Sequence, residues 1–489
     1  MGVVAKQSVQ NMFITYLGFA FGALNTLFLF THILSETDYG IVAYILATAN
    51  LMWPLFAFGL QNTLVKFYAT YTNKKDAYSF FSWLLLVPAI LFILIFSLYL
   101  IFYDNVMEYY DDSNPVMKSY VWVIVVMGLM AAYFEIFYSW TKVQLQSVKG
   151  NLLKELFHRV IISILLVVVY FEYITPYQFV ISLSVIFTLR TILMQQIAYR
   201  IHKPKFSLGK IDNVKSIATY SFLILIAATV SIFLLDLDKF MIENLAPPIA
   251  NVAIYSICVY MVSVIAVPKR AMLQIENPLT AQLLVKKDIS ALSELNKKSS
   301  LTSLIVTLFV GLLIVCNVHS IFKMIPEPYV LYIEIVLLVG FVKMTDAALG
   351  VTNSILFNSD SYQWILILGV GILGLAYYFN TIFIPAEGIV GAAFATFLSY
   401  MLYNLAKIIF VLYKFKIHPF TLKSAIVFIV ACGIYFVFYS WNINVHPLLS
   451  IVIKGVLISL SYVTIIYILK LSQEVNSVIN KILKIKIPG

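Results

Sequence analysis

The chain has 489 residues, of which 62% are hydrophobic and 11% are charged, and its mean hydropathy is +0.93. An ordinary soluble protein has about 25% charged residues, because most of its surface needs polar cover. The composition therefore excludes a soluble enzyme, a secreted disulfide-rich domain and a disordered chain. The net charge of +10 does not indicate a nucleic acid partner here, since lysines beside membrane spans face anionic lipid.

Long apolar runs follow one another along the sequence, and a membrane-spanning helix needs about 20 such residues. The fold class that they predict is an all-α polytopic membrane protein with about 14 transmembrane helices. We expect these spans at residues 11–33, 39–61, 79–103, 118–140, 157–171, 177–198, 216–235, 248–268, 299–317, 329–350, 362–379, 388–413, 424–440 and 447–469.

The distribution of Lys and Arg predicts the orientation of the spans. If the N-terminus is cytoplasmic, the outside loops contain two basic residues, Lys239 and Lys323, whereas most of the 33 Lys and Arg lie in the inside segments. Basic residues are enriched in cytoplasmic loops. We therefore expect both termini to face the cytoplasm.

Two pairs of segments indicate an internal repeat. Residues 34–44 align with 245–255, and residues 203–205 align with 414–416, both at an offset of 211 residues. This offset carries the first predicted span onto the seventh and the sixth onto the twelfth, so both halves keep the same orientation, as in transporters with parallel repeats. We expect an N-terminal lobe at 1–205, a C-terminal lobe at 206–423, and two additional spans with a cytoplasmic tail at 424–489.

Four stretches of this sequence look familiar in order and spacing. They read Leu-Ser-Glu-Thr-Asp-Tyr-Gly at 34–40, Phe-Gly-Leu-Gln-Asn-Thr-Leu-Val-Lys-Phe-Tyr at 58–68, Leu-Asp-Leu-Asp-Lys-Phe-Met-Ile at 235–242, and Ile-Pro-Ala-Glu-Gly-Ile-Val-Gly-Ala-Ala-Phe-Ala-Thr at 384–396. With them the chain resembles the bacterial polysaccharide (O-antigen type) flippases of the multidrug/oligosaccharidyl-lipid/polysaccharide exporter (MOP) superfamily. The resemblance runs through nearly the whole chain.

The resemblance implies two six-helix lobes around a central cavity that works by alternating access. It implies a flippase that moves an oligosaccharide repeat unit, linked to undecaprenyl pyrophosphate, from the cytoplasmic to the periplasmic leaflet. The product would enter assembly of a cell-surface polysaccharide such as lipopolysaccharide O-antigen. Such a protein would lie in the bacterial cytoplasmic (inner) membrane, among membrane lipids, and would work beside a polysaccharide polymerase and chain-length machinery.

Ionisable residues within or beside the spans are the first candidates for a site, because an anionic pyrophosphate cannot cross hydrocarbon unaided. Amide side chains on the first two spans suit glycan hydroxyls. As alternatives, the basic residues at the inner ends of spans snorkel to the interface, and the amides form hydrogen bonds between helices. The substrate-binding candidates are Lys66, Arg159, Arg190, Lys269, Arg270, Lys343, Asn25, Gln61 and Asn62.

Two acidic residues, Asp346 and Glu135, are candidates for ion coupling. Lys343 and Asp346 are three residues apart and therefore share a helix face. They form either an internal ion pair or a switch in which protonation of Asp346 frees Lys343. Glu135 either pairs with Arg159 or Arg190 as a structural contact between spans or belongs to an ion-coupling site.

The sequence predicts no cofactor and no metal. Cys258, Cys316 and Cys432 lie in apolar runs with a spacing that fits no metal site. A nucleotide-binding Gly-x-x-x-x-Gly-Lys-Ser/Thr motif is absent from the sequence, so an ion gradient, the membrane potential or consumption of the product would supply the energy. We therefore expect a transporter rather than an enzyme.

The sequence leaves two alternatives open. The first is a cation-coupled exporter of drugs or small molecules within the same superfamily. The second is a polytopic glycosyltransferase or polymerase, which would need a large catalytic loop. The longest predicted outside loop, 104–117, is short, and its acidic residues are typical of a solvated surface.

Overall fold

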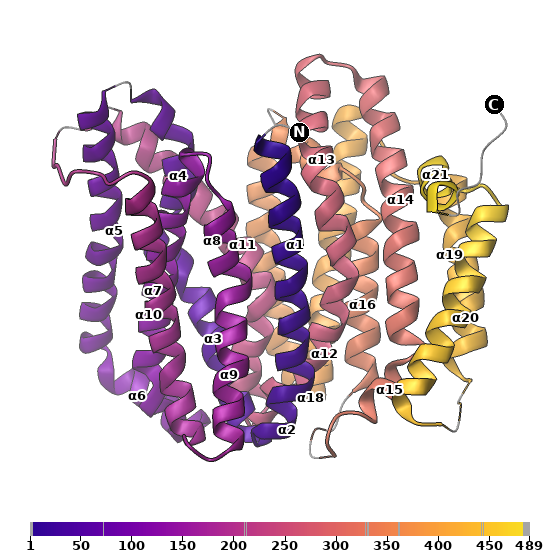
Figure 1. Cartoon of the computed structure of the whole chain (residues 1–489), viewed down its shortest axis with the longest axis horizontal. Coiled ribbons are helices and arrows are strands. Elements are labelled where there is room, and N and C mark those ends of the chain that lie inside the picture. Colours follow the sequence, from indigo (N-terminus) through magenta and orange to yellow (C-terminus); the bar gives the residue numbers. More distant parts are fainter. Residues whose placement is uncertain are drawn as a thin grey trace. The chain divides into compact units, whose positions relative to one another are not determined.

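The computed structural model describes residues 3–482, apart from 72, 210, 212, 328, 330–331, 360–361, 442 and 444. In this part of the chain every regular element is a helix (Figure 1). The predicted all-α fold class is therefore confirmed. The chain divides into two compact units, Met1–Ser256 and Ile257–Gly489, which are described separately. The lobes predicted at 1–205, 206–423 and 424–489 stay a prediction.

Unit 1 consists of long apolar helices joined by short loops. Its elements are α1 (Val3–Ala23), η1 (Leu24–Leu29), α2 (Phe30–Ile33), α3 (Glu36–Ala57), α4 (Leu60–Phe67), η2 (Tyr68–Thr70), α5 (Lys74–Ile101), α6 (Tyr103–Ser113), η3 (Pro115–Tyr120), α7 (Val121–Val143), α8 (Val148–Leu152), η4 (Leu153–Phe157), α9 (His158–Tyr170), α10 (Pro176–Ile201), α11 (Val214–Leu245) and the first turns of α12 (Ala250–Ser263).

Local sequence signals explain where α3 begins and ends. The side chain of Ser35 accepts a hydrogen bond from the backbone N–H of Asp38, and acidic residues in the first turn complement the positive end of the helix dipole. The helix ends where Phe58 and Gly59 both have positive φ angles. A Cβ atom on Gly59 would collide with the carbonyl oxygen of Ser221 on α11. Only glycine therefore permits this close approach between the break and α11.

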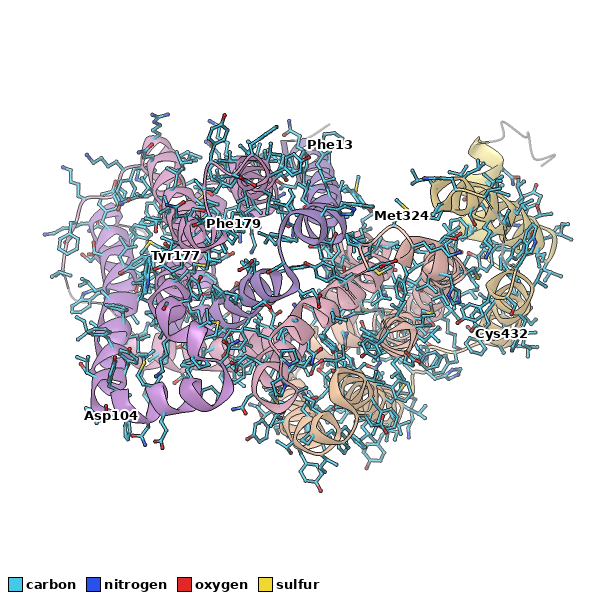
Figure 2. The ribbon with its side chains drawn as sticks, turned by 90° about the horizontal axis from the view of Figure 1, so that it is seen from below. Phe13, Asp104, Tyr177, Phe179, Met324 and Cys432 are labelled. Carbon is cyan, nitrogen blue, oxygen red and sulfur yellow. The ribbon has the colours of Figure 1, made fainter. Side chains whose placement is uncertain are left out.

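The helix α7 lies at the centre of unit 1 and packs against α3, α4, α5 and α10. The aromatic side chains of Phe80 and Phe81 on α5 and of Trp140 on α7 itself are completely buried. Figure 2 shows Phe179, which is also fully buried, whereas the labelled Phe13 on α1 is 64% exposed. The exposed apolar side chains of unit 1 are typical of helices whose outer face contacts lipid.

Unit 2 begins within α12 and is built around α14, which packs against α13, α16, α19 and α20. Its further elements are η5 (Val264–Ala266), α13 (Val267–Val285), α14 (Ile289–Val315), α15 (Val318–Phe322), α16 (Ile333–Ala347), α17 (Thr352–Asn358), α18 (Tyr362–Phe415), α19 (Leu422–Tyr439), α20 (Pro447–Ile468) and α21 (Gln473–Ile482).

Two interruptions shape the helices of unit 2. The pair α16 and α17 is bent by 58° at a break that contains Gly350, which has a φ of +58°. The element α18 has 54 residues, and its backbone is not helical at Glu387 and Gly388. A straight helix of that length would measure about 80 Å, more than twice the thickness of the hydrocarbon core. The kink lies at the predicted boundary between the runs 362–379 and 388–413; that these are two separate spans stays a prediction.

The described residues include ten helices long and apolar enough to cross a membrane, or eleven if α16 and α17 form one bent span. The protein is thus a multi-pass membrane protein. The predicted runs 157–171 and 216–235 fall on α9 and α11, which are not among the ten. The helix α18 counts once among the ten, although it contains the kink. The exact number of fourteen spans therefore stays a prediction.

Candidate functional site

A group of charged side chains lies inside unit 1, where α7, η4, α9 and α10 meet. We call it the basic cluster; its members are Glu135 and Lys142 on α7, Lys154 and Glu155 on η4, Arg159 on α9 and Arg190 on α10. η4 is a π-helix, a wide turn that is often found at functional sites. It brings charges from a segment that the sequence placed in a loop against the apolar helices.

Two ion pairs occupy the cluster. Lys154 Nζ lies 2.5 Å from Glu135 Oε1, and Arg159 Nη2 lies 3.9 Å from Glu155 Oε2. We expected Glu135 to pair with Arg159 or Arg190. This prediction is wrong, because Glu135 pairs with Lys154. The reason is that α8 and η4 extend the helix backward to residue 148, so Lys154 reaches α7 from within the helix.

Arg190 is 7% exposed and stacks between two aromatic rings. Its guanidinium carbon lies 4.4 Å from the ring centre of Phe134 and 4.5 Å from that of Phe187. Among the described residues, neither Arg190 Nε nor Arg159 Nη1 has a hydrogen-bond partner, although both atoms are buried. Buried donors of this kind are costly unless something binds them.

The basic cluster therefore has an excess of positive charge and free donors. Four cationic side chains face two carboxylates, and the two arginines still have N–H groups to donate. Guanidinium groups form paired hydrogen bonds with phosphate oxygens. Chemically, the cluster is suited to hold an anion with several oxygen atoms.

Asn25 on η1 joins the first helix of unit 1 to α9. Its Nδ2 donates to the carbonyl oxygen of Arg159 over 2.8 Å, and its Oδ1 accepts from Ser163 Oγ over 2.5 Å. Asn25 therefore forms hydrogen bonds between helices, which was the alternative expected for these amides. This contact also holds the backbone of Arg159 in place beside the basic cluster.

The remaining candidates of unit 1 lie on α4. Gln61 is 6% exposed, and no described group donates to its Oε1, whereas Asn62 is exposed. Lys66 is also exposed, and its Nζ lies 3.8 Å from the ring centre of Tyr220 on α11. This cation–π contact keeps the ammonium group at an aromatic surface while leaving it accessible.

In unit 2, Lys269 is buried and its ammonium group is used within the protein. It donates to the carbonyl oxygen of Gly350 over 2.6 Å and to the hydroxyl groups of Ser299 and Ser303 over 3.3 Å each. Glu276 Oε2 lies 3.7 Å away. Lys269 therefore neither snorkels nor offers a free donor, and its contacts are those of a structural residue.

The other candidates of unit 2 lie nearer its surface. Asp346 pairs with Lys407 on α18, whose Nζ is 3.6 Å from Asp346 Oδ1. Lys343 is half-buried, with its Nζ 5.7 Å from the ring centre of Tyr400, and Arg270 is exposed. The substrate role of these candidates stays a prediction.

Two charged partners, Lys407 and Lys154, were not among the residues predicted from the sequence. Lys407 lies within the predicted span 388–413, so the sequence alone could have identified it as an intramembrane lysine. Lys154 had no such signal, because the predicted span began at 157. Only the packing of η4 against α7 brings Lys154 to Glu135.

Several solved structures have a similar fold. The lipid II flippase MurJ in an inward closed conformation superposes with a TM-score of 0.68 at 15% identity, over 95% of this chain and 99% of that one. An outward-facing multidrug resistance MATE family transporter gives 0.56 at 11% identity, over 84% and 96%. A MOP superfamily transporter from Pyrococcus furiosus Vc1 gives 0.54 at 12% identity, over 84% and 96%. No curated protein matches in sequence.

The helical units and these likenesses define a multi-pass membrane protein with the fold of MOP superfamily transporters. The family model described as polysaccharide biosynthesis protein matches residues 8–272. This chain therefore belongs to the polysaccharide biosynthesis protein family, and its fold is the one expected for a MOP superfamily transporter.

Proposed function

We propose that this protein is a flippase for a lipid-linked oligosaccharide. It moves a repeat unit on undecaprenyl pyrophosphate from the cytoplasmic to the periplasmic leaflet of a bacterial inner membrane, for a surface polysaccharide such as O-antigen. The family membership and the MOP fold support a transporter in polysaccharide synthesis. The similar structure of MurJ is that of a lipid II flippase, so the same fold serves a lipid-linked substrate.

The observation that carries this proposal is the basic cluster of unit 1. A pyrophosphate needs several strong donors to leave water. Arg159 Nη1 and Arg190 Nε are buried donors that have no partner among the described residues. Arginine rather than lysine at these two positions supplies planar, paired donors.

Unit 2, taken by itself, contains apolar grooves of the kind that a polyprenyl chain binds. Apolar grooves of about 440 and 290 Å³ lie side by side between α14, α16, α18 and α19. They share the side chains of Leu308, Phe341, Met344 and Phe428. Each methylene that a polyprenyl chain buries in these grooves makes the free energy of binding more favourable.

The energy source is part of the proposal. Asp346 with Lys407 is an ion pair whose carboxylate side chain is 40% exposed, so protonation or cation binding at Asp346 would release Lys407. Glu135 is the second candidate for coupling. The proposed orientation has both termini in the cytoplasm, and the polymerase and chain-length machinery act on the product.

Purified protein in liposomes tests the proposal. A fluorescent sugar linked to a short polyprenyl pyrophosphate should cross the bilayer without ATP, and the double variant Arg159→Gln/Arg190→Gln should lose this activity. Movement no faster than in protein-free liposomes would refute the proposal. The matched control is Arg200→Gln on α10, because this arginine is exposed.

A cation-coupled exporter of drugs is the second candidate, since MATE transporters have a similar fold. The excess positive charge of the basic cluster disfavours a cationic substrate. Transport of a cationic dye by the same liposomes, with no transport of the lipid-linked sugar, would favour this candidate instead.

A further inference from the structure

Unit 1 contains an apolar cavity of about 630 Å³ that the flippase proposal does not use. It lies beside the N-terminal half of α5 and the first turns of α11, and its walls include Trp83, Leu84, Leu208 and Ile217. Leu208 is 53% exposed and Trp83 is 37% exposed, so the cavity opens on the surface of unit 1. Figure 1 shows α5 at one edge of this unit.

One wall of the cavity is the loop between α10 and α11, and hydrogen bonds tie this loop to α5 and α7. The backbone N–H of Ser207 donates to Ser82 Oγ over 3.1 Å, and Trp83 Nε1 donates to the carbonyl oxygen of Gly209 over 3.2 Å. Trp140 Nε1 donates to the carbonyl oxygen of His202 over 2.9 Å. The wall is therefore held in place without a ligand.

The same loop places positive charge beside the opening. Lys203 and Lys205 are exposed, and neither forms an ion pair with a residue that the structure describes. Phe206 and Leu208 beside them are 68% and 53% exposed. Lys205 is three residues from Leu208, which limits the distance along the chain to about 10 Å. Exposed lysines interleaved with exposed apolar side chains are typical of a segment at the lipid headgroups.

We propose that this cavity and loop bind one anionic phospholipid of the membrane. An acyl chain fills the apolar cavity, and the headgroup phosphate lies between Lys203 and Lys205. The charge of the loop selects an anionic lipid over a zwitterionic one, because each lysine near an anionic surface strengthens binding about fivefold. The walls of the cavity include no residue of the basic cluster, so the proposed lipid site does not depend on the identity of the transported substrate.

Native mass spectrometry of the full-length protein in detergent tests this site. Dioleoylphosphatidylglycerol should bind about 25-fold more tightly than dioleoylphosphatidylcholine, about fivefold for each lysine. Lys203→Gln/Lys205→Gln should abolish this preference. Ala218→Phe should weaken both lipids, because Ala218 lines the cavity and the larger ring would fill it.

The matched control is Lys414→Gln/Lys416→Gln, which removes two exposed lysines at the same spacing from unit 2. This control should keep the preference for phosphatidylglycerol. The proposal is overturned if the control pair has the same effect, if the two phospholipids bind equally, or if Ala218→Phe changes nothing. Displacement of phosphatidylglycerol by an equal concentration of undecaprenyl phosphate would also overturn it, because the cavity would then belong to the transported lipid.

Discussion

Lys269 Nζ donates a hydrogen bond to the carbonyl oxygen of Gly350 over 2.6 Å, at the point where α16 and α17 break. A broken helix leaves backbone groups without partners, which is costly in a membrane unless side chains satisfy them. Ser300 Oγ donates to the carbonyl oxygen of Ala348 over 2.5 Å, and Asn296 Oδ1 accepts from the N–H of Val351 over 2.9 Å. Three side chains from α13 and α14 therefore stabilise the break.

Replacing Lys269 with Met should destabilise the protein by about 3–5 kcal/mol, because Glu276 would lose its buried partner. Thermal unfolding in detergent measures the change. The neighbouring variant Arg270→Met removes a charge from an exposed position and should unfold close to the wild-type temperature. Equal unfolding temperatures for the two variants would contradict the structural role of Lys269.

Replacing Arg159 or Arg190 with Lys should weaken binding of undecaprenyl pyrophosphate by roughly tenfold. The charge remains, but the planar pair of donors is lost, and at position 190 so is the stacking on Phe134 and Phe187. Quenching of tryptophan fluorescence by the added lipid reports the affinity. Arg200→Lys on the same helix should bind as the wild type does. Unchanged affinity in both cluster variants would remove the cluster from the substrate path.

The pair of Glu135 and Lys154 should respond unequally to its two single substitutions. The side chain of Lys154 is 40% exposed, whereas that of Glu135 is 11% exposed. Lys154→Met leaves a buried carboxylate and should cost about 2 kcal/mol, while Glu135→Gln leaves an amine that reaches water and should cost within about 1 kcal/mol.

The double variant Glu135→Gln/Lys154→Met completes a thermodynamic cycle for this pair. The loss in free energy of unfolding of the double variant should be smaller than the sum of the two single losses, since one contact is counted in both single variants. Equal costs for the two single substitutions would show that the burial difference does not matter.

The kink of α18 depends on the backbone of Gly388, which has a φ of +60° and a ψ of −139°. An alanine there meets no atom within 4 Å, so the effect of Gly388→Ala comes from backbone strain alone, about 1–3 kcal/mol. Gly371→Ala in the same element also meets no atom within 4 Å and should be neutral or stabilise by up to about 1 kcal/mol. Circular dichroism during thermal unfolding distinguishes the two; a neutral Gly388→Ala would mean that the kink does not need glycine.

Part of the candidate site could be predicted from the sequence, because a charged residue within an apolar run is recognised without a structure. Glu135, Arg159 and Arg190 were found as ionisable residues of predicted spans, and they do meet in unit 1. Their partners could not be predicted. The pairing of Glu135 depends on where η4 widens the helix, and the donors left free depend on the distances between three helices.

Composition and the length of the apolar runs were by themselves enough for the helical membrane fold, because the cost of burying backbone and charge in lipid acts on every residue alike. The kink at Glu387–Gly388 also coincides with a predicted loop. Only the tertiary structure decided that Lys269 holds a broken helix while Arg159 and Arg190 keep unused donors. All three are basic residues in or beside apolar runs, and contacts between helices distant in sequence determine which of them is already satisfied.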